Sequence, residues 1–285
     1  MSAVVDRRLL APDVTLLVVD APRIARRQRA GQFVIVRVVP GGERIPLTIA
    51  DGDREAGTIT LVVQAVGKTT NVLSSLGIGD EILDLAGPLG MPSEIADYGT
   101  VVVVGGGVGV AVARPVAVAM AEAGNRVEAV IGAASGDRLL FEEDLRGVCD
   151  EVHVCTDDGS RGRHGLVTAA LAERLAVRSV DRVVSAGPVP MMAAVAECTR
   201  PHGIPTIASL NPIMVDGTGM CGGCRVSVGG VNKFACMDGP EFDAHLVDFG
   251  LLEQRNRAYV DWEAGQRDGL RPCFLGGRRP DRPEP

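Results

Sequence analysis

Short apolar segments alternate with turn residues along the first third of the chain. Four segments rich in Val, Ile, Leu and Thr are separated by Gly, Pro and Asp, at residues 13–19, 31–38, 45–50 and 57–66. Regularly spaced strands with few helical patterns predict a small antiparallel β-barrel over residues 1–97. We expect one helix there, over residues 70–76, and a last strand over 81–85 after a turn at 77–80.

The pattern changes at about residue 98. A continuous apolar strand at 101–104 leads into a glycine loop and a helix that ends near Ala123, before Gly124. Strands and helices then alternate, with strands at 127–131, 151–156 and 182–186 and helices at 141–145, 166–176 and 190–198. This alternation predicts a doubly wound, Rossmann-like α/β domain with a parallel sheet over residues 98–208 and ligands at the carboxyl ends of its strands.

A third region, residues 209–275, is rich in Gly, Cys and Asp, and its pattern becomes helical near residues 245–259. The final stretch, 276–285, is rich in Pro and Arg. Such a composition cannot bury enough apolar surface to fold, so we predict a disordered tail there.

Composition and charge narrow the class of protein. A hydrophobic share of 46% with 23% charged residues is typical of a globular protein, and the net charge of −7 argues against nucleic acid as a partner. No apolar run approaches the roughly 20 residues of a membrane span. Charged residues at 6–8 interrupt the segment where a signal peptide would be apolar, so we expect a cytoplasmic location. Seven cysteines, an odd number without a secretory signal, argue against a disulfide framework.

Three of the cysteines form the most specific motif in the chain, Asp216-x4-Cys221-x2-Cys224-x11-Cys236. Thiolates are the ligands that iron clusters require, and C-x4-C-x2-C…C is the spacing of plant-type 2Fe–2S sites, with Asp216 standing where the first cysteine would be. A zinc site with three cysteines is an alternative, and Asp216 also fits a turn residue before Gly217. We favour a metal centre in which Asp216 is a ligand.

A second motif is a glycine run directly after the strand at 101–104, formed by Gly105, Gly106, Gly107, Val108 and Gly109. Glycine permits a sharp strand-to-helix turn, and the helix N-terminus attracts a pyrophosphate, so the run predicts a nucleotide site. It departs from G-x-G-x-x-G because Val112 stands at the third glycine position. No acidic residue ends the second strand, so a standard Rossmann ribose contact is not supported.

Two further loops follow strands of the same sheet. Gly187, Pro188 and Met191 lie between a strand and a helix, beside the first glycine loop at the carboxyl edge. Asp157 and Asp158 open a charged loop that either touches the nucleotide ribose, or its 2′-phosphate, or is simply solvated. The mixture of acids and arginines leaves the choice between NAD and NADP open.

The barrel offers two candidate ligand segments, which plain strand ends would explain equally well. One is the run Pro46, Leu47 and Thr48. The other is Gly67 with Thr69 and Thr70, where a glycine turn and two hydroxyls at a helix start form a plausible phosphate cradle.

Together these features resemble the ferredoxin–NADP reductase superfamily, and within it the electron-transfer subunit of dihydroorotate dehydrogenase. They are most similar to the small subunit of NADH-dependent ferredoxin:NADP oxidoreductase and the related sulfide dehydrogenase subunit. The resemblance covers about residues 5–260, and its most specific stretch runs from 211–216 to 236–242. It implies an FAD-binding β-barrel, a Rossmann-like NAD(P) domain and a small C-terminal 2Fe–2S domain.

The resemblance also implies roles for particular residues. FAD is expected beside Pro46, Leu47 and Thr48, with its phosphates at Thr69 and Thr70; the neighbouring strand adds Val62, Val63 and Gln64 to this set. The family's arginine before the proline is Ile45 here, and the pair near the nicotinamide that includes a cysteine is Ala186-Gly187. In the ferredoxin:NADP oxidoreductase small subunit one aspartate and three cysteines bind the cluster. This pattern matches Asp216, Cys221, Cys224 and Cys236.

The implied function is electron transfer between NAD(H) or NADP(H), FAD, a 2Fe–2S cluster and a larger flavin- or iron–sulfur-containing partner subunit, with ferredoxin involved only indirectly. No catalytic side chain is expected because FAD carries the hydride chemistry. Dihydroorotate or polysulfide oxidoreductase subunits are alternatives that differ mainly in the partner. A zinc-stabilised regulatory module without redox chemistry is an alternative of another class, and a colourless protein would favour it.

Overall fold

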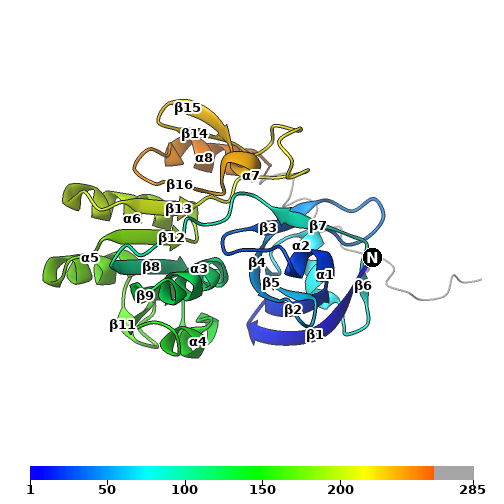
Figure 1. Cartoon of the computed structure of the whole chain (residues 1–285), viewed down its shortest axis with the longest axis horizontal. Coiled ribbons are helices and arrows are strands. Elements are labelled where there is room, and N and C mark those ends of the chain that lie inside the picture. Colours follow the sequence, from blue (N-terminus) through cyan, green and yellow to red (C-terminus); the bar gives the residue numbers. More distant parts are fainter. Residues whose placement is uncertain (260–285) are drawn as a thin grey trace, which may run out of the picture.

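The computed structural model describes residues 1–259, in which two seven-stranded sheets stand side by side and a smaller third region lies against both (Figure 1). The predicted tail at 276–285 and the end of the predicted third region lie outside the described residues. Within the described part of the chain, no helix is both long and apolar enough to cross a membrane.

The first sheet is antiparallel throughout and has the strand order β6-β1-β2-β5-β4-β3-β7. Its two edge strands, β6 and β7, are separated in sequence by Leu83 alone, whose N–H donates to the Val38 carbonyl at 3.2 Å. This link nearly closes the sheet into a barrel. The strands are β1 Ser2–Ala11, β2 Val14–Asp20, β3 Phe33–Arg37, β4 Ile45–Asp53, β5 Thr58–Gln64, β6 Glu81–Ile82 and β7 Asp84–Leu89, and the helices are α1 Pro22–Ala25 and α2 Lys68–Ser75.

Strands β2 and β5 are buried on both faces. Leu17 and Leu61 point into the barrel core, whereas the adjacent Leu16 and Val62 pack with residues of the second domain such as Val101. Side chains of a strand alternate between faces, so two burial surfaces require a continuous apolar run. The barrel is thereby fixed against the nucleotide domain through its own strands.

The second sheet has the order β11-β10-β9-β8-β12-β13-β16 and is parallel except for β16. The chain leaves β8 in one direction for β9 and returns to its other side for β12, so the topological switch point lies between β8 and β12. The strands are β8 Thr100–Gly106, β9 Arg126–Ala133, β10 Glu151–Thr156, β11 Arg163–His164, β12 Arg182–Ala186, β13 Thr206–Ser209 and β16 Glu241–Asp243. The connecting helices are α3 Val110–Glu122, α4 Glu142–Arg146, α5 Val167–Val177 and α6 Val189–Thr199, with 3₁₀ turns at η1 Gly107–Gly109, η2 Gly136–Arg138 and η3 Arg200–His202.

The third region contains the hairpin of β14 (Arg225–Val228) and β15 (Val231–Phe234), followed by the short helix α7 (Ala235–Asp238). Helix α8 (Phe249–Asn256) and the turn η4 (Arg257–Tyr259) end the described chain. The core of this region includes Phe33 of the barrel and Met192 of α6. The third region is therefore packed on both other domains rather than linked loosely to them.

Six strands were not predicted from the pattern: β1, β11, β13, β14, β15 and β16. The alternation of β1 is broken by the polar run Asp6, Arg7 and Arg8, whose side chains remain accessible beside the paired strand. Strands β13 and β16 are four and three residues long, too short to show a period. The predicted strand at 81–85 is divided into β6 and β7.

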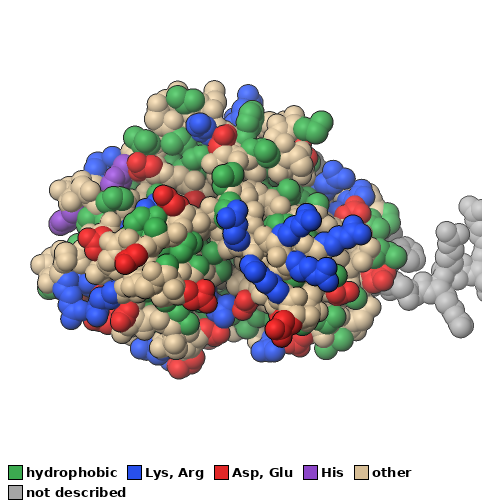
Figure 2. All heavy atoms as spheres, in the orientation of Figure 1, with side chains coloured by type: hydrophobic (Ala, Val, Ile, Leu, Met, Phe, Trp, Pro, Cys, Tyr) green, Lys and Arg blue, Asp and Glu red, His purple; other side chains and the backbone are tan. Residues whose placement is uncertain are grey.

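The net negative charge is unevenly distributed over the surface. Figure 2 shows Lys and Arg side chains gathered over the barrel near α1, where Arg23, Arg26, Arg27, Arg29 and Arg54 are exposed. Acidic and basic side chains are more evenly mixed over the nucleotide domain in the same view. The net charge of the chain therefore does not indicate the charge of any one face of the molecule.

Candidate functional site

A cavity of about 540 Å³ lies where the three regions meet. This volume is within the range of ligand pockets, about 300–1,000 Å³. The barrel contributes Phe33, Pro46, Leu47, Thr48, Val62 and Gln64, and the parallel sheet contributes Gly106, Gly107, Val108, Gly109, Ala111, Val112, Ala186, Gly187 and Pro188. The third region contributes Leu210, Asn211, Met214 and Pro240, with Ser209 at the end of β13.

The cavity thus unites two predicted sets of residues that are distant in sequence. Most of the predicted flavin residues of β4 and β5 line it, and so does most of the predicted nucleotide loop. None of its lining residues, all within the described chain, is ionisable. The cavity offers shape, backbone amides and a few neutral polar groups, but no acid or base.

The two predicted strand residues Val62 and Gln64 line the cavity, but Val63 between them does not. The Val63 side chain is fully buried in the barrel core, as the alternation of β5 requires. Its side chain is therefore unavailable to a ligand in the cavity.

The predicted phosphate cradle at the start of α2 is also outside the cavity lining. The Thr70 hydroxyl accepts hydrogen bonds from the Gly67 and Val66 N–H groups at 2.9 and 3.1 Å. The buried Thr69 hydroxyl donates to the Glu43 carboxylate at 2.8 Å. Both hydroxyls therefore already have partners within the protein, and what the segment presents to a ligand is the N-terminus of α2.

The glycine loop after β8 is shaped by close backbone approach. A Cβ on Gly109 would stand 2.3 Å from the Ala186 carbonyl oxygen, and one on Gly106 would stand 2.4 Å from the Met191 sulfur. Glycine is therefore required at Gly109, where the neighbouring atoms are backbone, whereas at Gly106 the Met191 side chain would have to move. Met191 does not line the cavity; it packs behind the loop, and the buried Gly105 likewise supports the loop from β8.

Asp157 and Asp158 lie at the carboxyl end of β10, away from the cavity lining. Their N–H groups donate to the carbonyls of Ala133 and Ala134 at 3.1 and 3.2 Å, which ties this loop to the end of β9. Hydrogen bonds from the Ser160 hydroxyl and amide lower the pKa of the Asp158 carboxyl. The Asp158 side chain is therefore an exposed anion on the rim of the domain.

The four predicted metal ligands lie in two adjacent pairs. The Cys221 N–H donates to Asp216 Oδ2 at 2.7 Å, and the Cys236 N–H approaches Cys224 Sγ at 3.5 Å. Cys224 and Cys236 are buried, whereas Cys221 is exposed and Asp216 is half-buried. Burial, together with the neighbouring Cys224, raises the pKa of the Cys236 thiol to about 12.

The donor types at this loop fit an iron–sulfur centre, because three of the four are thiols. A tetrahedral zinc ion with bonds of about 2.3 Å would draw all four donor atoms to within about 4 Å of one another. In residues 1–259 the ligand atoms that gather in threes within 4.8 Å are those of Glu128, Glu151 and His153, so the cysteine loop does not form such a set. A binuclear iron–sulfur centre takes soft thiolates as its main ligands, which this loop supplies.

The group of Glu128, Glu151 and His153 is explained by ion pairs instead. Glu128 is fully buried and paired with the buried Arg174, while Glu151 accepts from Arg126 at 2.6 Å and from Arg178 at 2.8 Å. The carboxylates are thus neutralised by arginines and serve the packing of β9, β10 and α5.

Several cavity residues were not predicted as ligand contacts: Phe33, Leu210, Asn211, Met214 and Pro240. Most of them belong to the third region, which folds back over the switch point of the sheet. The available signal was positional, because residues 209–214 follow β13 directly and ligands gather at the carboxyl ends of such strands.

Comparisons with known proteins agree with this geometry. Residues 2–93 match the family described as oxidoreductase FAD-binding domain, and residues 211–248 match the iron–sulfur cluster binding domain of dihydroorotate dehydrogenase B. The fold and site therefore define an oxidoreductase that combines a flavin-binding barrel with an iron–sulfur domain. The second match also favours iron over zinc at the cysteine loop.

Full-length relatives define the family more closely. The chain is 46% identical over 263 residues to the dihydroorotate dehydrogenase B (NAD(+)) electron transfer subunit homolog of Thermotoga maritima, covering 92% of this chain and 93% of the relative. It is 34% identical to the corresponding subunit of Bacillus caldolyticus, covering 86% of this chain and 96% of the relative. A chain in the solved structure of an NADH-dependent reduced ferredoxin-NADP oxidoreductase, which concerns flavin-based electron bifurcation, superposes with a TM-score of 0.90 at 44% identity, covering 94% of this chain and 97% of that one.

The chain belongs to the family of dihydroorotate dehydrogenase B electron-transfer subunits. The predicted resemblance, the three-part fold class and the flavin-dependent oxidoreductase class are confirmed, as are FAD and an iron–sulfur cluster as the cofactors of its domains. The individual ligand residues and the partner stay predictions.

Proposed function

We propose that the protein passes electrons between a nicotinamide nucleotide and a larger partner subunit, through FAD held in the interdomain cavity and a 2Fe–2S cluster held by Asp216, Cys221, Cys224 and Cys236. The observation that carries the proposal is the cavity itself. It adjoins the flavin barrel, the nucleotide loop and the cluster region, yet it contains no ionisable side chain. Chemistry in such a cavity depends on a cofactor rather than on an acid or base of the protein.

The protein's own residues would bind and orient the reactants. The β4 segment from Pro46 to Thr48 forms one wall, and the loop from Gly106 to Gly109 presents backbone amides at the opposite wall. Bound FAD supplies the chemistry that exchanges a hydride with the nucleotide and single electrons with a one-electron centre. The mainly apolar walls would pack against the bound ring system.

The third region would connect the cavity to the cluster. Met214 and Pro240 line the cavity, and each is close in sequence to a proposed cluster ligand, Asp216 or Cys236. The Gly217 backbone lies against Ile35 and Leu89 of the barrel, where a Cβ would approach both side chains to 2.7 Å. The cluster loop is thus held directly against the flavin domain, as rapid electron transfer requires.

Anaerobic purification tests the proposal. We expect flavin and iron–sulfur absorption, iron and acid-labile sulfide, and bleaching of both chromophores when NADH or NADPH is added. The proposal would be overturned if the protein bound neither flavin nor iron. It would also be overturned if neither NADH nor NADPH changed the absorption of the flavin and the cluster.

The partner is proposed to be a larger subunit with its own flavin or iron–sulfur centres, in a complex of the ferredoxin-NADP oxidoreductase type to which the chain is similar. Asp216 in place of a fourth cysteine favours this group. Isolation of the native complex should yield such a subunit. A dihydroorotate dehydrogenase catalytic subunit would instead support the alternative that the Thermotoga relative's name suggests.

A further inference from the structure

Two loops of the nucleotide domain lie beside the glycine loop at the carboxyl edge of the sheet. Strand β9 pairs with β8, and β10 pairs with β9, so their ends lie about 5 and 10 Å from the end of β8. A nucleotide whose pyrophosphate rests on the β8 loop extends its adenosine half along such an edge. The loops are held together, since the Gly136 N–H donates to Ser160 Oγ at 2.8 Å and the Arg161 N–H donates to Thr156 Oγ1 at 3.1 Å.

A hollow of about 280 Å³ opens between these loops and α4. Three carboxylates line it, those of Glu142, Glu143 and Asp144, together with one guanidinium, that of Arg161. A guanidinium at this position is the group that a ribose 2′-phosphate would seek, because it binds phosphate through paired hydrogen bonds. The strength with which Arg161 could bind a phosphate depends on the anionic groups that it already contacts.

Arg161 already has an anionic partner. Its Nε donates to Glu142 Oε2 at 2.8 Å, and the Glu142 side chain is only 11% exposed. The other oxygen, Oε1, accepts from Arg146 at 3.0 Å, so Glu142 is fixed between two arginines. Burial raises the pKa of Glu142, but the hydrogen bonds from Arg161 and Arg146 outweigh it and keep the carboxyl ionised.

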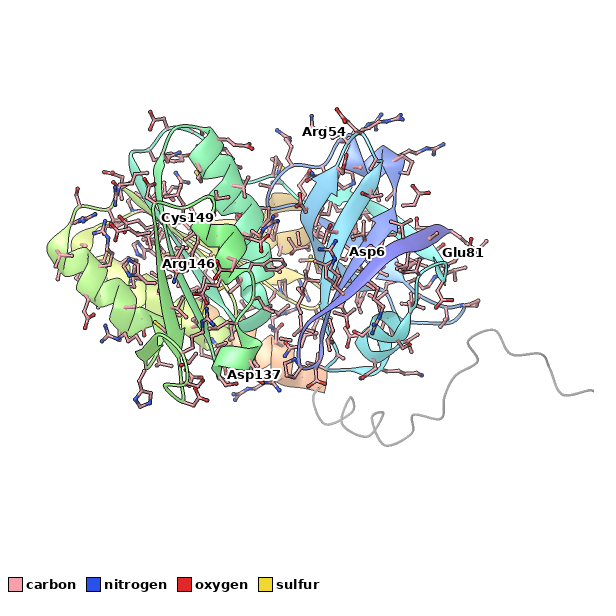
Figure 3. All side chains as sticks on the ribbon, turned by 90° about the horizontal axis from the view of Figure 1, so that it is seen from below. Asp6, Arg54, Glu81, Asp137, Arg146 and Cys149 are labelled. Atoms are coloured by element: carbon pink, nitrogen blue, oxygen red, sulfur yellow. The ribbon has the colours of Figure 1, made fainter. Side chains whose placement is uncertain are left out.

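The other arginines at this edge also face carboxylates. Arg138 lies 3.8 Å from Asp13 of the barrel, Arg163 pairs with Glu173, and Arg114 lies 3.5 Å from Asp144. Figure 3 labels Asp137 of η2 and Arg146 of α4, which both belong to the nucleotide domain. The basic groups of the edge are thus neutralised internally, while Glu143, Asp157 and Asp158 add exposed negative charge.

We propose that Glu142 is the residue that selects NAD(H) over NADP(H), because it neutralises Arg161 in an ion pair and places its own negative charge where a 2′-phosphate would bind. This inference deepens the proposed function and rests on it. A phosphate dianion entering the hollow would face three carboxylates and a guanidinium whose charge Glu142 already balances. The uncharged 2′-hydroxyl of NAD(H) is not repelled by these carboxylates and needs no cation.

The test measures binding of oxidised nucleotides to the complete, cofactor-loaded protein by calorimetry, so that no electron transfer intervenes. The wild type should bind NAD⁺ more tightly than NADP⁺. Glu142→Gln should raise the NADP⁺ affinity about tenfold, the equivalent of one charge-assisted hydrogen bond, and change the NAD⁺ affinity less than about twofold. An unchanged NADP⁺ affinity would overturn the proposal.

Two variants separate release of Arg161 from a general loss of negative charge. Glu143→Gln removes the same charge from the same hollow, but Glu143 is exposed and forms no ion pair within residues 1–259, so its effect should stay below about twofold. Adding Arg161→Gln to Glu142→Gln should abolish the gain. Equal gains in the two glutamate variants, or a gain that survives in the double variant, would refute the role of Arg161.

The outcomes also distinguish this inference from the proposed function. A wild-type protein that binds neither nucleotide would contradict the nucleotide site as a whole. Normal NAD⁺ binding, with an NADP⁺ affinity that does not change in Glu142→Gln, would contradict only the proposed role of Glu142. Thermal melting of each variant verifies that it is folded.

Discussion

The flavin cavity and the cluster loop are constructed in opposite ways. The cavity is lined by the ends of regular strands and by a glycine turn, and no ionisable group faces it among the described residues. The loop at 216–224 is irregular backbone that carries an aspartate and two cysteines, with the third cysteine supplied by α7. Under the proposed function, one site would hold its ligand by shape and main-chain groups, and the other by particular donor atoms.

This difference predicts which substitutions each site tolerates. A change of side-chain chemistry should matter little in the cavity unless it alters shape, whereas the loop should fail when one donor atom is removed. The two sites should also fail separately, since the cavity walls come mainly from the barrel and the sheet while the donors come from the third region.

The largest effect is expected from Cys224→Ala. Cys224 is buried beside Cys236, and its loss removes one of four ligands without space for a replacement. We expect loss of essentially all iron and acid-labile sulfide, with the flavin absorbance retained. Iron assay and the visible spectrum measure both.

The matched control is Cys198→Ala, which removes a half-buried thiol on α6 outside the cluster loop. It should keep its full iron content. If Cys224→Ala retained iron as well, the assignment of the loop as the cluster site would be wrong.

The second-largest effect is expected from a substitution in the cavity wall, which should weaken nucleotide binding without affecting the cluster. Gly109→Ala places a Cβ 2.3 Å from the Ala186 carbonyl oxygen and 2.6 Å from the Gly187 Cα, both backbone atoms that cannot simply rotate away. We expect nucleotide affinity to fall at least about tenfold and stability by about 1–3 kcal/mol, with iron content unchanged. Calorimetry and denaturant unfolding check these values.

Gly250→Ala in α8 provides the comparison, because its Cβ would make an ordinary contact of 3.5 Å with Asp248 Oδ1. It should bind nucleotide like the wild type. An equally strong loss in both variants would show that the effect of Gly109→Ala is not specific to the loop.

The same contrast explains what the sequence could predict. The donor set of the cluster could be read directly, since spacing and residue type define it. Apolar periodicity also predicts the strand-rich region and the βαβ region, including β8 and its glycine turn. Element boundaries moved by only one to a few residues, as for α5 at Val167–Val177 against the predicted 166–176.

What the pattern missed depends on tertiary packing. Nothing local reveals that Phe33 and Pro240, separated by most of the chain, share a cavity wall. The partnering of Thr69 with Glu43 and of Arg161 with Glu142 could not be predicted either, because each joins segments without a fixed spacing. Conversely, Val63 was assigned to the flavin site although strand alternation points it into the barrel core.

A smaller, spectroscopic effect should distinguish a ligand from a turn residue at Asp216. Its carboxylate accepts N–H groups of Thr218 at 2.8 Å and Cys221 at 2.7 Å, and each oxygen retains a second lone pair for iron. Asp216→Cys should therefore keep the cluster but change its absorption, electron paramagnetic resonance spectrum and reduction potential. Asp216→Asn, which keeps an oxygen acceptor for the turn, should lower the iron content. A normal cluster with an unaltered spectrum in both variants would show that Asp216 is a turn residue and not an iron ligand.

The smallest effect concerns the junction between the two sites. Glu241 of β16 follows the cavity residue Pro240 and accepts a hydrogen bond from the Ser93 hydroxyl at 2.7 Å, on the segment that joins barrel and sheet. Burial raises the pKa of its carboxyl, against the opposing influences of Ser93 and the charge of Arg182. The folded state therefore holds this proton more tightly than the unfolded state does.

The sign of the pH dependence follows from that difference. The contribution of Glu241 to stability is fully present below its unfolded pKa, near 4.3, and is lost as pH rises through the raised folded pKa. Glu241→Gln keeps an acceptor for Ser93 but cannot ionise, so the melting temperature of the wild type relative to this variant should fall between pH 4.5 and pH 8. A difference that stayed constant or grew over this range would show that the carboxyl is not desolvated at the junction. A fall confined to melting, with iron content and nucleotide affinity unchanged, would show that Glu241 contributes to the stability of the junction and not to the chemistry of either site.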